Sequence, residues 1–394
     1  MAARREWLGA LLAVATLALG CQPQGDRPAK AEDALGEAGE VVRLPFVEDH
    51  EGGRFGYVDR TGRIVIPPTF AYAQPFEDGH ALVVEPGGDQ AIVDPSGKRV
   101  GAVPRCPEEF GCYPDLQEVS QGRIMFGQPG GCTDGGYMDM NGKVVIKPRF
   151  KIATRFSEGL AWVANDKFPD APHDWRWFCI DRSGGRKFPV HFRQVCPFAE
   201  GFAAVQNEAK RWCHVDTESK VLADQFWDNA DKFSEGLAFV CGGGFRGYID
   251  RTGRRVIALP AGAGRGEPFS NGLALFEIRG GSDGPTKSGY IDRSGKVVVG
   301  PVFGYGHGFS EGLAFFTTTN SDGEDVKKGF IDATGRYRIE LPACNLTADF
   351  RNGLCAVELH EGGTEKIVYI DRVGQIAIRP PAGCRFYVMF PGRD

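Results

Sequence analysis

A unit of about 40 residues is repeated along most of this chain, and the repetition constrains the fold more than any other feature. Every copy has a short aromatic or β-branched stretch that ends in aspartate and runs into a turn. The nine turn aspartates lie 34 to 45 residues apart, at Asp59, Asp94, Asp139, Asp181, Asp216, Asp250, Asp292, Asp332 and Asp371. Tandem units share one continuous core, so we do not expect the two or three separate domains that 394 residues would otherwise suggest.

Each unit contains three predicted β-strands. In the clearest copy, Ser288–Phe316, the stretch Gly289–Asp292 predicts one strand and Val297–Val299 predicts its partner across the turn. The third strand, Leu313–Phe316, follows a second recurrent motif, Phe-Ser-Glu-Gly. Related motifs stand at Phe76–Gly79, Phe156–Gly159, Phe198–Gly201, Phe233–Gly236, Phe269–Gly272 and Phe350–Gly353. The sequence therefore predicts an all-β fold of tandem β-repeats.

The two ends of the repeat region complement each other. Leu44–Val47 stands where a third strand is expected, and the last hairpin, Val368–Ile378, lacks the Phe-Ser-Glu-Gly half of the unit. If the start completes the end, the sheets close into a ring without open edges, which favours a β-propeller-like ring. An open β-solenoid or stack with end caps is the alternative, because about eight units plus a terminal half unit make a large ring. In a ring we expect the Leu-Ala strand inside, the Lys-Val-Val-Ile strand outside, and the Pro-x-Phe segment crossing to the next blade as a short outer strand.

The units resemble WG repeats, also called KWG repeats, which occur in many bacterial proteins. The resemblance covers about residues 55–381 and rests on Gly-Tyr-Ile-Asp-x-x-Gly-Lys, Val-Ile-x-Pro and Phe-Ser-Glu-Gly-Leu-Ala. The tryptophan that usually precedes the glycine is replaced in most copies, by Phe55, Gly135, Arg246, Ser288 and Lys328. The resemblance implies a β-rich scaffold for interactions and brings no catalytic residues with it.

The first twenty residues are typical of an export signal. Arg4 and Arg5 precede the apolar run Leu8–Leu19, which is too short to span a membrane comfortably. Ala18-Leu19-Gly20-Cys21 resembles the lipobox of bacterial lipoproteins, although Ala18 stands where that pattern usually has leucine. The resemblance implies cleavage before Cys21 and a lipid on its sulfur. A plain secretory signal with a coincidental cysteine is the alternative.

We therefore divide the chain into a lipoprotein signal peptide (1–20), a flexible acylated tether (21–40) and a WG-type repeat domain (41–394). The tether is predicted because residues 22–40 contain almost nothing apolar to bury. Gln22, rather than aspartate, after the cysteine favours outer-membrane sorting in a Gram-negative cell. The expected location is the cell envelope, with a lipid anchor in the outer membrane and a periplasmic or surface-exposed domain.

Cysteine content and net charge narrow the possible functions. Ten cysteines remain besides Cys21, so disulfides are expected in an oxidising compartment. The best candidates for one bridge lie in the irregular second unit, at Cys106, Cys112 and Cys132, whereas Cys179 and Cys355 occupy strand positions typical of buried thiols. A formal charge of −5 argues against a nucleic-acid partner.

Several motifs look catalytic, but their context favours structural roles. Gly308–Gly312 fits the Gly-x-Ser-x-Gly pattern of hydrolases, yet a strand follows it rather than the required helix. Gly242–Gly247 fits a dinucleotide pattern, and again a strand follows. Local bonding within each turn explains the repeated aspartates. Asp322–Asp325 is a better calcium candidate but lacks the spacing of a known calcium loop. The seven histidines show no zinc spacing, so we expect no catalytic residue, metal or cofactor.

One insertion departs from the repeat. Asn165–Trp177 carries Trp175 and Arg176, residue types favoured at binding surfaces, and these two are the candidate binding residues. Trp177 is expected to be packed, and an ordered surface loop is the simplest alternative. We expect a non-enzymatic, monomeric envelope scaffold that binds a protein. The alternatives are a glycan-binding or peptidoglycan-binding module and, less favoured, an envelope hydrolase with acidic residues on one face of the ring.

Overall fold

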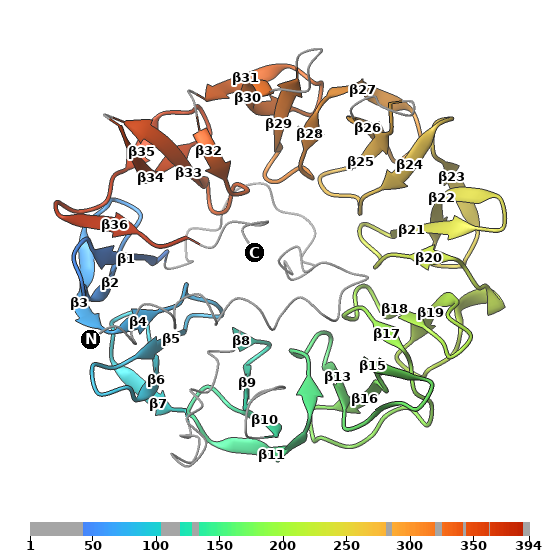
Figure 1. Ribbon diagram of the computed structural model, residues 1–394, viewed down its shortest axis with the longest axis horizontal. Helices are drawn as coiled ribbons and strands as arrows, with labels where there is room; N and C mark the ends of the chain where they lie inside the picture. Colours follow the sequence, from blue (N-terminus) through green and yellow to red (C-terminus); the bar gives the residue numbers. More distant parts are fainter. Residues whose placement is uncertain are drawn as a thin grey trace.

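The described residues form a closed ring of antiparallel β-sheets (Figure 1). This computed structural model describes residues 42–103, 119–127, 134–280, 286–319, 325–341, 344–361 and 363–388. Over these ranges nine sheets follow one another around a central axis as the blades of a β-propeller, and the only helical element is the short 3₁₀ turn Leu222–Asp224. The predictions of an all-β repeat fold and of a ring are confirmed.

We number the blades by their turn aspartates, from Asp59 in blade 1 to Asp371 in blade 9. The strands of blades 1 to 4, apart from the last strand of the chain, are β1 (Leu44–Glu48), β2 (Phe55–Val58), β3 (Ile64–Phe70), β4 (Tyr72–Ala73), β5 (Ala81–Val84), β6 (Gln90–Val93), β7 (Arg99–Ala102), β8 (Val119–Ser120), β9 (Arg123–Phe126), β10 (Gly135–Met138), β11 (Val144–Phe150), β12 (Ile152–Ala153), β13 (Leu160–Ala164), β14 (Lys167–Phe168), β15 (Ala171–Trp175) and β16 (Phe178–Asp181).

Blades 5 to 9 and the closing strand complete the ring. Their strands are β17 (Gln194–Val195), β18 (Phe202–Gln206), β19 (Trp212–Asp216), β20 (Asn229–Ala230), β21 (Leu237–Gly242), β22 (Phe245–Asp250), β23 (Arg255–Ala258), β24 (Ala263–Gly266), β25 (Leu273–Ile278), β26 (Lys287–Asp292), β27 (Val297–Phe303), β28 (Tyr305–Gly306), β29 (Leu313–Thr319), β30 (Asp325–Asp332), β31 (Tyr337–Leu341), β32 (Cys344–Thr347), β33 (Leu354–Glu361), β34 (Thr364–Asp371), β35 (Ile376–Ile378) and β36 (Cys384–Phe386).

A regular blade has four strands, of which the innermost is very short. Blade 8 runs β28-β29-β30-β31 from the axis outward (Figure 1), and β28 has only two residues. The expectation that Pro-x-Phe forms a short outer strand after crossing is wrong. Pro301 and Phe303 end β27 itself, where the outermost strand can tolerate a missing N–H, and the chain then enters β28 on the inside of blade 8.

The last strand of the chain closes the ring. β36 pairs antiparallel with β1, with Phe386 opposite Phe46. The predicted closure is therefore present. We expected the start of the chain to complete the last blade, but β1 pairs with the next strand, β2, so the end of the chain completes the first blade. Tyr387 adds an edge-on aromatic contact to Phe55 and Tyr72, at ring-centroid distances of 5.4 and 5.6 Å.

Each turn aspartate binds the backbone of its own turn. Asp292 Oδ1 accepts hydrogen bonds from the backbone N–H groups of Ser294 (2.9 Å) and Lys296 (3.0 Å) and from the Ser294 hydroxyl (2.6 Å). The two backbone bonds recur in all nine turns. The prediction that local turn bonding accounts for these aspartates is confirmed.

The glycine before the strand tyrosine is required by the strand beside it. At Gly289 a Cβ atom would lie 2.7 Å from the carbonyl oxygen of Val299, because β27 bulges between its pairs with Tyr290 and Ser288. Blades 4 and 5 have Phe178 and Cys213 at this place, and within the described residues neither blade has a regular fourth strand. The repeat is therefore least regular at blades 4 and 5.

Neighbouring blades share a buried hydrogen bond. The hydroxyl of Tyr290, which is fully buried, donates to the backbone carbonyl of His307 in the next blade at 2.8 Å. Tyr57, Tyr137 and Tyr248 repeat this bond at 2.6 to 2.7 Å. In blade 4 the indole N–H of Trp162 takes over the same role. The blades thus follow one another in a fixed register.

Part of the sequence-based interpretation lies outside the described residues. This applies to the signal peptide, to Cys21 and the tether, and to Cys106, Cys112 and Cys132. Cys179 and Cys355 are buried thiols, as their strand positions predicted. Cys196 is disulfide-bonded, whereas Cys179, Cys213, Cys241, Cys355 and Cys384 are not. Within the same residues no helix has the length and apolar character needed to cross a membrane.

Candidate functional site

The ring has two chemically different faces. Because the four strands of a blade alternate in direction, the turn between the first and second strands and the turn between the third and fourth lie at the same end. We call this end the turn face; it carries the Phe-Ser-Glu-Gly turns and the aspartate turns. The opposite end, the loop face, carries the loops between second and third strands and the crossings between blades.

An inner circle of tight turns links blade to blade on the turn face. Glu311 and Gly312 both have positive φ (51° and 78°), as a two-residue type I′ turn requires. Glu311 Oε2 accepts a hydrogen bond from the backbone N–H of Gly353 in the next blade at 2.9 Å. The same bond joins Gln121 to Gly159, Glu158 to Gly201, Glu200 to Gly236, Glu235 to Gly272 and Asn271 to Gly312.

The serine of the motif makes a second bond of this kind. The hydroxyl of Ser310 donates to the backbone carbonyl of Phe350 in the next blade at 2.6 Å, and Ser310 is only 2% exposed. Ser120, Ser157, Ser234 and Ser270 bond in the same way to the following blade. The Gly-x-Ser-x-Gly match at Gly308–Gly312 is thus a hairpin turn followed by the strand β29, as its sequence context indicated.

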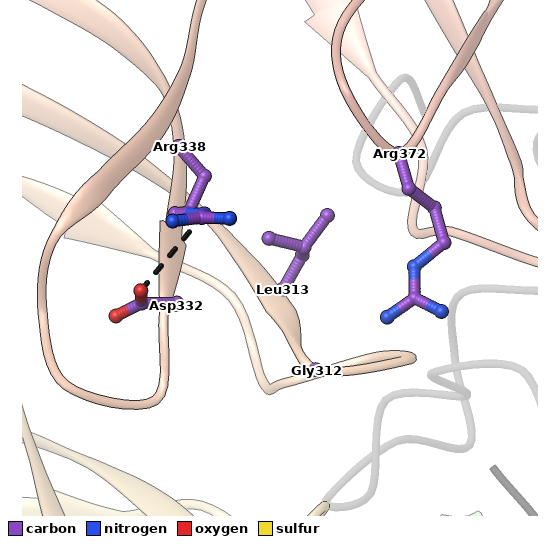
Figure 2. Close-up of a pocket in the computed structure, with 5 residues that line it drawn as sticks. All are labelled: Gly312, Leu313, Asp332, Arg338 and Arg372. Carbon is purple, nitrogen blue, oxygen red and sulfur yellow. Dashed lines mark ion pairs between the residues drawn. The ribbon is translucent and has the colours of Figure 1, made fainter.

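A shallow groove lies between blades 8 and 9 on the turn face (Figure 2). It has a volume of about 410 Å³ and is lined by Gly312, Leu313, Asp332, Arg338 and Arg372. Arg338 is 4.0 Å from Asp332, while Arg372 of blade 9 donates to the backbone carbonyl of Glu311 at 2.6 Å. Two guanidinium groups therefore flank the Leu313 side chain, an arrangement that suits a hydrogen-bond acceptor group with an apolar part.

A wider hollow of about 630 Å³ lies on the loop face between blades 1 and 2. It is lined by Arg54, Pro68, Thr69, Phe70, Glu85, Pro86 and Gly87. Glu85 is already paired with Arg99 at 3.2 Å. The hollow is open, and its lining mixes two prolines and an aromatic ring with Arg54 and the paired Glu85, so it offers contact area rather than a set of reactive groups.

The Asn165–Trp177 insertion forms a β-hairpin, β14–β15, on the loop face of blade 4. Trp175 is half-buried against the core, and Lys167 Nζ lies over its ring, 5.0 Å from the centroid. The Arg176 side chain is 30% exposed, and its Nη1 lies 2.9 Å from Asp166. Trp177 is packed, as expected. Trp175 and Arg176 thus both reach the surface at the base of an ordered hairpin.

Arg193 fixes this hairpin to the ring, and no motif in the sequence points to this residue. Its side chain is only 4% exposed and contacts Asp170 (2.6 Å) and Asp174 (3.1 Å), both on the hairpin. Its guanidinium also lies 4.4 Å from the ring centroid of Phe168. The hydrogen bond from Arg193 holds the pKa of Asp170 below its usual range. Arg193 reaches the hairpin only because blade 5 packs beside blade 4, and no periodic pattern in the sequence indicates that contact.

Titratable side chains also gather at the axis in blades 6 to 9. Burial raises the pKa of Glu267 to about 7, although Arg265 lies 3.1 Å away. Burial also raises the pKa of Asp231. His307 Nδ1 lies 3.2 Å from Asp349. Among the residues described, no three His, Cys, Asp or Glu side chains are placed to hold a metal. Asp322–Glu324 of the calcium candidate lies outside them.

Comparisons with known proteins agree with the repeat and the fold. A family model described as "WG containing repeat" matches residues 55–86, 136–167 and 289–320. Each match begins in the third strand of a blade, counted from the axis, and ends within the next blade. No curated protein matches the chain.

Among solved structures, the crystal structure of a protein described as "the eukaryotic initiation factor" is similar over 89% of this chain and 97% of that one. The identity is 11% and the TM-score 0.58, so this likeness concerns the fold alone. BamB from Moraxella catarrhalis matches over 72% of this chain and 92% of its own, at 10% identity. Its TM-score is only 0.37, so the fold comparison rests on the former structure.

Proposed function

The chain is a WG repeat-containing protein whose described residues close into a nine-bladed β-propeller, and on that premise we propose a non-catalytic scaffold that binds a protein partner at the cell envelope. The observation that carries the proposal is the β14–β15 hairpin. Blade 6 joins its second and third strands with a tight turn, whereas blade 4 has an inserted hairpin at the same place. A buried arginine at the start of blade 5, Arg193, holds that hairpin through Asp170. A rigid projection of this kind presents contact groups at a low cost in conformational entropy.

The polar residues of the repeat support a scaffold role rather than chemistry. The turn aspartates bind their own backbone, the turn glutamates bind the next blade, and Ser310 bonds to Phe350. Groups that are committed to backbone in this way hold the ring in shape. Specific recognition is then left to residues that depart from the repeat, and Trp175 and Arg176 are two of these.

The position of the first described residues supports an orientation for the anchored protein. Leu44 pairs with Val58 next to an aspartate turn, so β1 begins at the turn face. Arg43 Nε donates to the backbone carbonyl of Pro95 on the same face at 3.0 Å. With a lipid on Cys21, the 22 residues from Cys21 to Val42 reach at most about 75 Å when fully extended. The tether would then join the ring at the turn face, on the opposite side from the hairpin.

The hairpin is tested by replacing residues 165–176 with Asn-Gly, a two-residue hairpin turn. A soluble form of the chain, Gln22–Asp394, is cross-linked in envelope extract with and without the replacement. We expect a discrete protein partner to be captured by the unaltered form and lost with the replacement, while both forms melt at similar temperatures. Equal capture by both folded forms would contradict a hairpin-dependent partner.

A glycan partner is the second reading of the same hairpin. It would need to stack on the free face of Trp175, and the ammonium of Lys167 already lies over that ring. This contact favours a protein partner. Trp175→Ala that abolishes binding to purified peptidoglycan without affecting protein capture would reverse the preference.

The anchor is tested separately with Cys21→Ser. Loss of the lipid is expected to move the protein from the membrane fraction to the soluble fraction, since the thiol is the acylation site in the lipobox resemblance. Alanine replacement of Cys384, a thiol at the other end of the chain, is the control and should leave fractionation unchanged. Membrane retention of Cys21→Ser would contradict the anchor and leave the hairpin proposal standing.

A further inference from the structure

Two departures from the repeat meet at the rim of blade 4. One is the hairpin, which ends at Arg176. The other is the missing regular fourth strand: the chain from Arg186 to Phe192 makes only isolated bridges to β16 and its neighbour. Fold rules are most often broken where a sequence meets a functional demand.

His191 lies between two guanidinium groups. Arg176 Nη2 is 3.4 Å from His191 Nδ1, and Arg186 Nη2 is 3.3 Å from His191 Nε2. The Phe178 ring packs against the His191 imidazole and the Arg186 guanidinium, with its centroid 6.1 Å from the former and 5.0 Å from the latter. His191 and Arg176 are half-buried, and Arg186 is exposed.

This arrangement has more donors than acceptors. A guanidinium only donates, and a neutral imidazole has one N–H and one lone pair. Whichever tautomer is present, one of the two ring nitrogens therefore turns an N–H toward a guanidinium N–H. The Nε of Arg176 is also buried without a partner among the described residues. An oxygen that accepts from both N–H groups would satisfy the contact.

From this geometry we propose that Arg176, Arg186 and His191 form a binding site for an oxyanion, a phosphate or carboxylate group that bridges the two guanidiniums across the imidazole. Arg186 contributes from the open side. Its Nε and Nη2 already donate to the backbone carbonyls of Phe188 (2.7 Å) and Pro189 (3.1 Å), which holds the guanidinium in place and leaves Nη1 to donate to the anion. A hydrogen bond from a charged N–H to a phosphate or carboxylate oxygen is among the stronger ones in proteins. The anion site shares Arg176 with the Trp175 surface, but anion binding does not depend on a protein partner.

The surrounding charges make the site sensitive to pH. Burial and the cationic Arg176 and Arg186 lower the pKa of His191, whereas Asp166 and Glu208 act in the opposite direction. Asp166 also neutralises Arg176 in part, at 2.9 Å. A bound anion favours the imidazolium, so binding raises the pKa of His191. By linkage, anion affinity rises as the pH falls through that pKa.

Sulfate is a suitable first probe because its charge does not change between about pH 8 and about pH 6, where histidine titrates. The side-chain resonances of the seven histidines are followed by NMR on the purified full chain, in sulfate and in chloride at equal ionic strength. We expect sulfate to raise the pKa of His191 and to leave the other histidines unchanged. A parallel series with acetate distinguishes a phosphate-like from a carboxylate ligand.

Variants make the test specific. Arg186→Gln is expected to weaken sulfate binding about ten-fold or more, as the loss of a charged hydrogen bond does. Arg186→Lys should recover only part of the sulfate affinity, because an ammonium lacks the planar guanidinium that bonds to two backbone carbonyls and still has an N–H for the anion. Lys187→Gln is the matched control: it removes the same charge from the next residue, whose Nζ pairs with Glu218 at 3.2 Å.

The proposal is overturned if neither sulfate nor acetate shifts the titration of His191. It is equally overturned if sulfate shifts it as much in Arg186→Gln as in the unaltered chain, with both proteins melting at similar temperatures. Either result leaves hairpin-dependent capture of a protein untouched, so the two proposals fail independently.

Discussion

At the scale of single residues, the polar side chains of this protein bind backbone far more than they bind one another. Asp292, Ser310 and Glu311 stand for three sets that recur around the ring, each with a backbone partner. The sequence predicted turn bonding for the aspartates and a structural role for the motif that contains Ser310 and Glu311. Their partners in the next blade were not predictable, because a bond between Ser310 and Phe350 depends on how two blades pack.

His214 predicts how stability depends on pH. It is 2% exposed, its Nε2 lies 2.7 Å from the backbone carbonyl of Asp231, and burial lowers its pKa to about 4. The unfolded chain takes up a proton near pH 6.5 and the folded chain does not, so stability present above that pH is lost as the pH falls toward 4. The expected loss is about 3 kcal/mol, measured by urea unfolding at a series of pH values.

His214→Gln is the comparison for this experiment. It removes the titrating group, so the slope of stability between about pH 6.5 and about pH 4 should flatten even if the variant is less stable overall. His80→Gln, at a partly exposed turn position, is the control and should retain the slope. A slope that is the same in all three proteins would assign the acid sensitivity to other groups.

At the scale of the β-strands, the glycine of each Gly-Tyr-Ile-Asp strand is fixed by the bulge beside it. Repeat periodicity predicted three strands of each blade, because they alternate and end in clear turns. It did not predict the innermost strands, since two residues such as Tyr305–Gly306 carry no readable period. Nor did it predict that β27 continues through Pro301. Proline lacks the N–H that a central strand needs, but a bulged strand at the outer edge of a sheet accommodates it.

The bulge gives a prediction for Gly289→Ala. A Cβ atom there would lie 2.7 Å from the Val299 oxygen and 2.9 Å from the Phe276 ring, so β27 must shift. We expect a loss of about 1–3 kcal/mol in unfolding free energy, the usual cost of overpacking. Gly300→Ala in the same blade is the matched control, because a Cβ there meets nothing within 4 Å. Similar stability of the two variants would refute the steric explanation.

At the scale of the whole molecule, a ring was predictable from the sequence and its manner of closure was not. The complementary ends favoured closure, but they did not show which strand of the repeated unit begins a blade. The pairing of β1 with β2 and β36 shows it. The cluster of Arg176, Arg186, His191 and Arg193 was equally hidden. Its members come from non-repeating segments, and only the packing of blades 4 and 5 brings them together.

Closure predicts the effect of a short truncation. A chain that ends at Pro381 lacks β36 and the Tyr387 contacts to Phe55 and Tyr72. We expect a lower melting temperature and a tendency to self-associate through the uncovered edge of β1, seen by calorimetry and size-exclusion chromatography. A chain that ends at Val388 keeps β36 and is the control. An unchanged melting temperature for the shorter chain would mean that β36 is dispensable.

The place of β36 also sets the order of events during biosynthesis. This strand follows all the other described strands in the chain, so the ribosome has made every one of them before blade 1 can acquire its innermost strand. Until then β1 offers an unsatisfied row of backbone donors and acceptors to any passing strand. A propeller of this design stays open until β36 has been made, and its exposed strand edge is open to aggregation up to that point.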